Sequence, residues 1–382
     1  MPTRASARPS VVIAAGGTGG HIYPGLALAA ALREQDPGAE ISFVGTARGL
    51  ESRLVPDAGY RLHLVGMVPF SGRERVLAPL ALVRAAWQCR RILRRERATV
   101  AVSMGGYAGL PLVVGARLAG IPALVHESGA VAGRANRLAA RMTPHVALAF
   151  EAAGASLPGR DSRVVGMPLL GLITAFDKMS LRDEARAAFG LAPETTMVLV
   201  VGGSQGSVRL DGLALGLAER WRARDDVVIV LKASRSNLPN IEQQAHEQGL
   251  EGVLRAVTYL ERMDHAYAAA DVGIFRAGAS TVAELALVGL PSILVPYPHA
   301  PDDHQAVNAG VLVDAGAAVM VRDDEATAER VGAVIEQWLA DRAGVEEMAS
   351  AARSVARPHA AQDLAAWALD LAAGGGRVPS RT

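Results

Sequence analysis

Short apolar runs rich in β-branched residues alternate with helical patterns along the whole 382-residue chain. Runs of this kind, bounded by Gly and Pro, are typical of buried parallel strands. Their alternation with helices predicts an α/β protein with doubly wound parallel sheets and right-handed crossovers. We expect strands at residues 11–15, 40–44, 61–65, 100–103, 123–125, 145–149, 163–165, 197–201, 227–232, 254–257, 272–275, 292–295 and 318–321.

Two such series of strands in succession predict two Rossmann-like domains, and the chain is long enough to give each its own core. We place the boundary at Gly166-Met167-Pro168, with an N-terminal domain at residues 10–167 and a C-terminal domain at residues 168–354. A late helical pattern at about residues 355–373 is expected to pack back on the first domain. Ligands of open α/β sheets bind at the carboxyl ends of the strands, so we expect an active site in a cleft that both sheets face.

The charge is unevenly distributed between the two halves. Residues 1–167 contain 20 Arg, no Lys and 10 acidic residues, a net charge of +10, whereas residues 168–382 have a net charge of −9. A basic half suggests an anionic partner, for which a phospholipid surface, a pyrophosphate and a nucleic acid are the candidates. The alternative is an ordinary solvated surface rich in Arg.

Cysteine usage favours a reducing compartment, and the hydropathy pattern does not predict a membrane span. The single cysteine, Cys89, excludes a disulfide framework. The polar start of the chain runs directly into the first expected strand, without the pattern of a signal peptide. The most apolar stretch, residues 98–125, is interrupted by Gly, Pro and Arg, so it predicts a strand, a loop and a helix rather than a membrane span.

A Gly-rich turn with a histidine, Gly16-Gly17-Thr18-Gly19-Gly20-His21, joins the first strand to a helical stretch from Pro24 to Leu32. Its glycines allow close approach of a ligand and leave N–H groups free at a helix start, which suits an anion. The spacing is not the dinucleotide fingerprint, because Ile22 occupies the last glycine position, and no Walker lysine follows. An ordinary tight βα turn is the alternative.

Comparable turns follow other strands. In the first half these are Met104-Gly105-Gly106-Tyr107 and His126-Glu127-Ser128-Gly129, which are expected near His21. In the second half, Gly202-Gly203-Ser204-Gln205-Gly206 precedes a helix and offers two side-chain donors. A phosphate at these turns would be held by helix N-termini and Arg276 rather than by a metal, since no Asp-x-Asp or zinc spacing occurs.

Two more segments of the second half have residue types suited to a sugar nucleotide. Glu284 lies one turn into the helix after Arg276-Ala277-Gly278, where a carboxylate can accept both hydroxyls of a ribose or merely stabilise the helix dipole. The loop at residues 296–308 combines His304, Gln305 and Asn308, and such imidazoles and amides bind sugar hydroxyls.

The sequence at residues 202–206 also matches Gly-x-Ser-x-Gly, the nucleophile elbow of α/β-hydrolases. A hydrolase needs an acid and then a histidine later in the chain. Asp302 and His304 are too close in sequence to be an obvious pair, although His359 remains possible. The hydrolase hypothesis leaves the other Gly-rich turns unexplained.

A basic segment at residues 73–97 mixes eight Arg with apolar residues. Its pairs Arg90-Arg91 and Arg94-Arg95, with Arg97 and the nearby Trp87, favour a surface for anionic lipid headgroups. The alternative is an amphipathic helix with a solvated basic face.

Taken in order and spacing, these motifs resemble the MurG family, the lipid I N-acetylglucosaminyltransferases of bacterial peptidoglycan synthesis. The resemblance extends from Val11 to about Leu371. It implies the GT-B fold and an inverting UDP-GlcNAc-dependent hexosyltransferase that needs neither metal nor cofactor. It also implies an enzyme on the cytoplasmic face of the cell membrane, with UDP-GlcNAc, lipid I and anionic lipids as partners and no nucleic acid.

The resemblance also implies a role for each motif. The donor-binding residues would be Ser204 and Gln205 at the diphosphate or sugar, Tyr259 and Leu260 at uracil, Arg276, Ala279 and Ser280 at the diphosphate, Glu284 at the ribose, and His304 and Gln305 at GlcNAc. The acceptor-binding residues would be Gly17, Thr18, Gly19, Gly20, Gly105, Gly106, Tyr107 and Gly129. His21 is the first candidate for the base that deprotonates the C4 hydroxyl of MurNAc, and Glu127 is the second. Binding of the lipid pyrophosphate is the rival role of His21.

Three positions depart from the family's pattern. Gly129 stands where Asn is usual, Leu170 where Arg is frequent, and Met167 where Asn is common. These departures are compatible with a divergent member and with a relative that was recruited to another acceptor, such as an antibiotic precursor. A UDP-GlcNAc 2-epimerase of the same fold and a non-catalytic sugar-nucleotide-binding protein are further alternatives.

Overall fold

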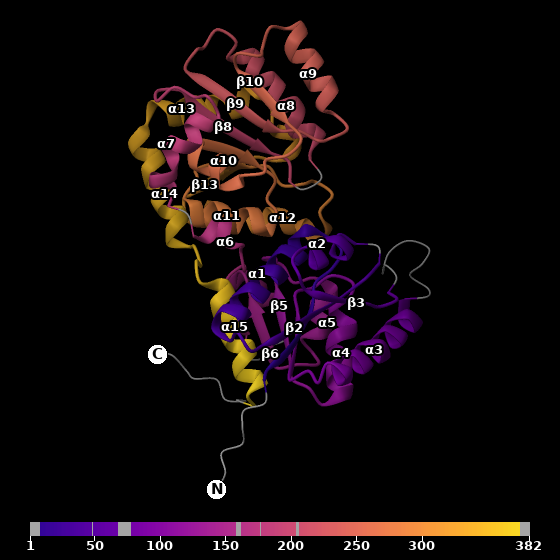
Figure 1. The fold of residues 1–382 in the computed structure, drawn as a ribbon. Helices are drawn as coiled ribbons and strands as arrows, with labels where there is room; N and C mark the ends of the chain where they lie inside the picture. The colour runs from indigo at the N-terminus through magenta and orange to yellow at the C-terminus, as the bar shows by residue number, and fades with distance from the viewer. Residues whose placement is uncertain are drawn as a thin grey trace. The chain divides into compact units, whose positions relative to one another are not determined.

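The computed structural model describes residues 8–47, 49–67, 78–157, 162–175, 177–203 and 206–374. The chain divides into two compact units. Unit 1 contains Met1–Leu170 and Arg357–Thr382, and unit 2 contains Gly171–Ala356. The division after Leu170 is close to the boundary expected after Met167. Figure 1 shows that each unit is a sheet with helices packed on it.

Unit 1 is built on a sheet of seven parallel strands, as far as its residues are described, in the order β3-β2-β1-β4-β5-β6-β7. The strands are β1 Ser10–Ala14, β2 Glu40–Gly45, β3 Arg61–Leu64, β4 Val100–Ser103, β5 Ala123–Glu127, β6 His145–Leu148 and β7 Ser162–Val164. The connecting elements are α1 Gly19–Gln35, α2 Glu51–Asp57, α3 Ala78–Arg95, α4 Gly109–Ala119, α5 Arg134–Ala139 and the 3-10 helix η2 Glu151–Ser156.

Alternate residues of β1 pack into two different helix layers, as expected for a strand that is buried on both faces. Val11 and Ile13 pack with α1 and with the C-terminal helix α15 (Ala360–Ala372). Val12 and Ala14 pack with α3 and α4. Helix α15 lies beside α1, so the end of the chain supplies part of the core of unit 1 (Figure 1).

Unit 2 repeats this plan with a six-stranded parallel sheet among its described residues, in the order β10-β9-β8-β11-β12-β13. The strands are β8 Thr196–Val201, β9 Val227–Lys232, β10 Leu254–Val257, β11 Val272–Phe275, β12 Ser292–Leu294 and β13 Ala318–Met320. The helices are α6 Gly171–Thr174, α7 Lys178–Ala188, α8 Val208–Arg220, α9 Leu238–Glu247, α10 Met263–Ala269, α11 Ala279–Val288, η3 Pro301–Asp303, α12 His304–Asp314, η4 Asp323–Glu325, α13 Ala328–Ala340 and α14 Arg342–Ser354.

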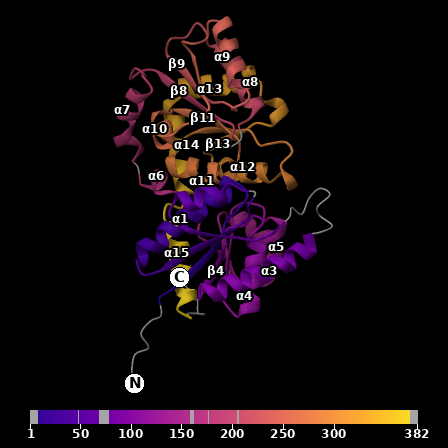
Figure 2. The same ribbon diagram turned by 45° about the vertical axis from the view of Figure 1, so that its right-hand side comes forward.

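Unit 2 also has helices on both faces of its sheet. Helices α8, α9 and α13 share one core with Val198 and Val200 of β8, and α8 and α9 lie side by side (Figure 2). On β11, Ile274 points into the same core, so Phe275 points to the opposite face. There its ring lies 6.2 Å from that of Tyr267, which places α10 on the second face.

The structure confirms the α/β class and every expected strand, with ends that agree to within two residues. The expected helix at Pro24–Leu32 is longer than predicted. It begins at Gly19 and contains Pro24 in its interior. His21 therefore lies in the first turn of α1 rather than in the loop before it.

In each unit the strand order reverses at one place, between β1 and β4 in unit 1 and between β8 and β11 in unit 2. Such a switch point leaves a crevice at the carboxyl ends of the two strands, where ligands of doubly wound sheets bind. Four of the segments singled out in the sequence follow these four strands, and the other two follow the neighbouring strands β5 and β12. Within the described part of the chain, no helix is both long and apolar enough to cross a bilayer.

Candidate active site

The Gly-rich turn after β1 is held in place by a carboxylate that the sequence analysis did not single out. The N–H of Gly17 donates to Oε2 of Glu51 over 2.9 Å. We expected the turn to leave its N–H groups free, and at Gly17 this is wrong. Thr18, the N-cap of α1, makes no side-chain capping bond. The first-turn N–H groups of Gly19 and Gly20 consequently have no cap from its hydroxyl.

The turn after β4 packs directly against the turn after β1. A Cβ atom on Gly106 would overlap the carbonyl of Gly16, and one on Gly105 would lie 2.8 Å from Cδ2 of His21. Both glycines have positive φ, +96° at Gly105 and +76° at Gly106. Only glycine permits this conformation and this approach together. The structure thus brings the two turns and His21 into one site, with the Tyr107 ring near Gly17.

The surroundings of the His21 imidazole favour its neutral form. Burial lowers its pKa, while the negative charge of Glu51 and the carbonyl of Gly16 act in the opposite direction. Its place in the first turn of α1 also disfavours the imidazolium, because the N-terminal end of a helix is electropositive. Nδ1 lies 3.5 Å from the hydroxyl of Thr18. The nitrogen of a neutral imidazole that has no hydrogen can accept a proton.

The end of β5 supplies the second candidate base in a different setting. Glu127 is buried and accepts hydrogen bonds from the N–H groups of Gly129 at 2.9 Å and Gly133 at 3.1 Å, and from the Asn136 amide at 2.9 Å. Burial raises the pKa of Glu127, and these donors oppose the rise. Three partners on its two oxygens favour a structural carboxylate over a base. Asn136, which also donates to the carbonyl of His126, was missed in the sequence analysis.

His126 next to it is a structural residue. It is fully buried, and its Nε2 lies 2.9 Å from the carbonyl of Gly166, which places a proton on that nitrogen. Burial lowers the pKa of His126 to about 4. The imidazole therefore stays neutral at physiological pH and ties β5 to the segment that follows β7.

In unit 2, the start of α11 and Glu284 form the centre of the expected donor site. Gly278 is the N-cap of α11 and gives no side-chain cap, so Ala279 and Ser280 lie at an uncapped helix start, which suits a phosphate. Tyr267 donates its hydroxyl to Oε2 of Glu284 over 2.6 Å. Burial raises the pKa of Glu284 to about 7, against the effect of this hydrogen bond. Tyr267 is a second residue that the sequence analysis missed.

Arg276 was expected to bind the diphosphate, but all its nitrogens already have protein partners. Nε and Nη2 donate to the hydroxyl of Ser207 at 3.2 and 2.9 Å, and Nη1 donates to the carbonyls of Val295 and Pro296 at 3.1 Å. Nη1 also lies 2.6 Å from Oδ1 of Asp323. This arrangement suits a residue that joins the turn after β8 to the loop after β12.

Ser204 and Gln205 lie outside the described residues. On one side of them, the carbonyl of Gly203 accepts a hydrogen bond from Nζ of Lys232 over 2.8 Å. Burial lowers the pKa of Lys232, which is one of only two lysines in the chain. Lys232 lies at the carboxyl end of β9 and was not predicted as a site residue. The signal that could have found it is that lysine is rare in this chain, whose other basic residues are mostly Arg.

The loop after β12 holds the two expected sugar-binding residues through its own main chain. Oε1 of Gln305 accepts from the N–H of Tyr297 at 2.9 Å, and Nδ1 of His304 lies 2.8 Å from the carbonyl of Pro301. The amide nitrogen of Gln305 and Nε2 of His304 are not used in these bonds. Asp302 and Asp303, just before them, adopt φ values of 54° and 48°. Such left-handed residues are strained and concentrate at functional sites.

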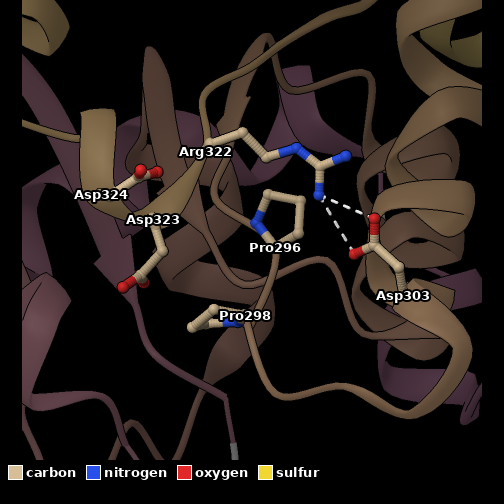
Figure 3. Close-up of a pocket in the computed structure, with 6 residues that line it drawn as sticks. All are labelled: Pro296, Pro298, Asp303, Arg322, Asp323 and Asp324. Carbon is tan, nitrogen blue, oxygen red and sulfur yellow. Dashed lines mark hydrogen bonds and ion pairs between the residues drawn. The ribbon is translucent and has the colours of Figure 1, made fainter.

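A cavity of about 510 Å³ borders this loop (Figure 3). Its lining is charged, and one wall is the ion pair between Asp303 and Arg322 at 2.8 Å. The other lining residues are Pro296, Pro298, Asp323 and Asp324. The expected uracil residues lie elsewhere in unit 2, where Tyr259 is exposed and Leu260 is half-buried. Among the described residues, no group of three or more His, Cys, Asp or Glu side chains could hold a metal ion.

The two doubly wound sheets have the architecture of a glycosyltransferase of the GT-B class. Residues 11–148 match the glycosyltransferase family 28 N-terminal domain, and residues 197–364 match the glycosyltransferase family 28 C-terminal domain. The chain belongs to glycosyltransferase family 28.

Individual relatives match over nearly the whole chain. Proteins named UDP-N-acetylglucosamine–N-acetylmuramyl-(pentapeptide) pyrophosphoryl-undecaprenol N-acetylglucosamine transferase are 39% identical in Rhodococcus erythropolis (95% of both chains) and 41% identical in Saccharopolyspora erythraea (95% of this chain, 94% of the relative). The crystal structure of Acinetobacter baumannii MurG superposes with a TM-score of 0.77 at 28% identity, covering 95% of this chain and 100% of that one. A UDP-bound MnaA from S. aureus has a TM-score of 0.70 at 12% identity, covers 98% of this chain and 100% of that one, and shares the fold alone.

Proposed function

We propose that the protein transfers GlcNAc from UDP-GlcNAc to the C4 hydroxyl of MurNAc in lipid I, which produces lipid II for peptidoglycan synthesis. The observation that carries this proposal is the match of about 40% identity over 95% of the chain to relatives named for that transfer. The site of unit 1 supports it, since the neutral imidazole of His21 lies beside two close-packed glycine turns, where it can take the proton of a sugar hydroxyl.

The reaction would be a single displacement with inversion at the anomeric carbon. His21, neutral in the first turn of α1, would accept the proton of the C4 hydroxyl as it attacks. UDP would leave as its charge is stabilised by the uncapped start of α11, with no metal required. Glu284 would hold the ribose, and Gln305 and His304 would hold GlcNAc through the nitrogens that their loop leaves unused.

The three departures from the family's pattern define the alternatives. Gly129 donates its N–H to Glu127, Met167 is buried, and Leu170 is partly exposed. UDP release from UDP-GlcNAc, measured with and without a lipid I analogue, tests the function. Release that requires lipid I supports the proposal. Release that ignores lipid I but responds to another polyprenyl or antibiotic-like acceptor contradicts it, and so does epimerisation of UDP-GlcNAc without an acceptor.

The affinity for UDP-GlcNAc is expected to rise roughly tenfold between pH 6 and pH 8. A carboxylate accepts the two ribose hydroxyls, and Glu284, whose pKa is raised to about 7, is mostly protonated at pH 6 and mostly ionised at pH 8. Calorimetric titrations with UDP-GlcNAc measure this, because both of its phosphates are esterified and do not titrate in that range. Glu284→Gln is the control, which should bind UDP-GlcNAc weakly and with an affinity that changes less with pH. An equal change of affinity with pH in the wild type and in Glu284→Gln would contradict the prediction.

We propose further that α3 docks the enzyme on the cytoplasmic face of the cell membrane. Three apolar side chains at helical spacing point outward, with exposures of 72% at Leu80, 58% at Val83 and 49% at Trp87. The Arg90 guanidinium lies 5.0 Å from the centre of the Trp87 ring. Apolar residues beside basic ones on a helix surface suit an interface with anionic lipids.

The double variant Trp87→Ser/Arg91→Glu is expected to bind phosphatidylglycerol vesicles at least about tenfold more weakly, since each surface charge contributes about 1 kcal/mol. Vesicle co-sedimentation measures the effect. Arg222→Glu, an equal charge change on the exposed surface of unit 2, should keep nearly full binding. Equal losses in the two variants would show a general effect of charge instead of a docking surface.

A further inference from the structure

Glu51 stands out as a buried acidic residue to which the proposed chemistry gives no role. It opens α2 and is fully buried. Oε2 accepts the N–H of Gly17 at 2.9 Å, and Oε1 accepts the N–H and the hydroxyl of Thr46 at 2.8 and 2.9 Å. These three bonds link the turn after β1 to the end of β2.

The main chain closes tightly around this carboxylate. A Cβ atom on Gly16 would lie 2.7 Å from Oε1 of Glu51, and one on Gly45 would lie 2.5 Å from its Cγ. A Cβ on Gly49 would overlap the carboxylate itself. Three separate positions therefore leave room for Glu51 by having no side chain, which indicates a built site rather than a chance contact.

We propose that Glu51 is a positioning residue for transfer, which fixes the turn after β1 and places a negative charge near His21. This inference rests on the proposed function, in which His21 takes the proton of the acceptor hydroxyl. Because Gly17 already donates to Glu51, its N–H is not available to an anion. A second anion beside a buried carboxylate is also unfavourable. This end of the turn therefore suits a sugar hydroxyl better than a pyrophosphate.

The charge of Glu51 acts on the imidazole as well as on the main chain. It raises the pKa of His21 against the larger lowering by burial. The other titratable groups at this site are His126 and Glu127 at the end of β5 and Tyr107 after β4. Burial keeps His126 neutral, and Glu51 is the charged group that opposes the lowering of the His21 pKa by burial.

Glu51→Gln tests the inference in the full-length enzyme with UDP-GlcNAc and a lipid I analogue. We expect kcat to fall roughly ten- to hundredfold because the turn shifts. The acid limb of the kcat–pH profile, measured at UDP-GlcNAc concentrations that saturate the enzyme at every pH so that the ionisation of Glu284 does not limit the rate, reports His21 and should move to lower pH. KM for UDP-GlcNAc should stay unchanged. Glu96→Gln is the matched control, because this buried side chain of unit 1 pairs with Arg61 and His63 instead.

The outcomes separate this inference from the function on which it rests. Without lipid I-dependent release by the wild type, the proposed function itself fails. If the wild type is active and Glu51→Gln has the same kcat and the same acid limb, only the positioning role fails. The positioning role is also overturned if Glu51→Gln raises KM for UDP-GlcNAc and leaves the acid limb unmoved. Should Glu51→Gln not fold, Glu51→Asp keeps the charge but shortens the reach. It should lower kcat with the acid limb in place, and a wild-type kcat in Glu51→Asp would overturn the proposal.

Discussion

Replacing His21 with alanine is expected to lower kcat by about 10²- to 10⁴-fold, the usual contribution of a general base, and to leave the affinity for UDP-GlcNAc nearly unchanged. The imidazole is neutral and packed between two glycine turns of unit 1, whereas the expected donor residues belong to unit 2. The loss should therefore appear in the chemical step. Single-turnover kinetics with a lipid I analogue, alongside calorimetric titration of UDP-GlcNAc, measure the two quantities.

Two controls make this result specific. His246→Ala removes an exposed imidazole of α9 that pairs with Glu251, and it should have wild-type kcat. Glu127→Gln removes the rival base but keeps the shape of the side chain. A kcat near wild type in His21→Ala, together with a large loss in Glu127→Gln, would assign the proton transfer to Glu127 instead.

The strands of the fold could be predicted because each depends on local sequence. Apolar β-branched runs such as β8 and β11 end at Gly or Arg, and a few residues of such a run are enough to predict a strand. The start of α1 was placed too late because Pro24 suggests a helix start, although it lies inside the helix here. Glycines at positions 19 and 20 are poor helix formers in a helix interior, so the sequence does not mark them as the first two residues of α1.

The candidate site could be predicted only where a motif is contiguous. His21, Gly105 and Gly106 follow strand ends, and strand order alone brings them together. Glu51 and Tyr267 act on residues 34 and 17 positions away, respectively, and no local pattern marks such contacts. Arg276 shows that a contiguous motif can also suggest a role that the contacts of the residue do not favour. Its position after β11 suggested a phosphate ligand, yet its partners lie after β8, β12 and β13.

Arg276→Met is expected to reduce the free energy of unfolding by about 2–3 kcal/mol, because loss of the buried guanidinium leaves its hydrogen-bond acceptors without donors and leaves Asp323, whose side chain is 22% exposed, without a counterion. Asp323 would lose its counterion, and Ser207 and the carbonyl groups of Val295 and Pro296 would lose the donors that the guanidinium now supplies. UDP affinity should fall as well, because Ser207 caps α8 beside the turn after β8. Urea unfolding and UDP titration measure the two effects.

Arg322→Met is the matched control in the same part of unit 2. Arg322 pairs with Asp303, but both side chains are about half exposed, so the loss should be within about 1 kcal/mol. The double variant Arg276→Met/Asp323→Leu should recover part of the lost stability, because it leaves no unpaired charge behind. Recovered stability without recovered UDP affinity would show that Arg276 serves the donor site through its hold on Ser207. Equal losses in Arg276→Met and Arg322→Met would contradict this, because burial is what distinguishes the two ion pairs.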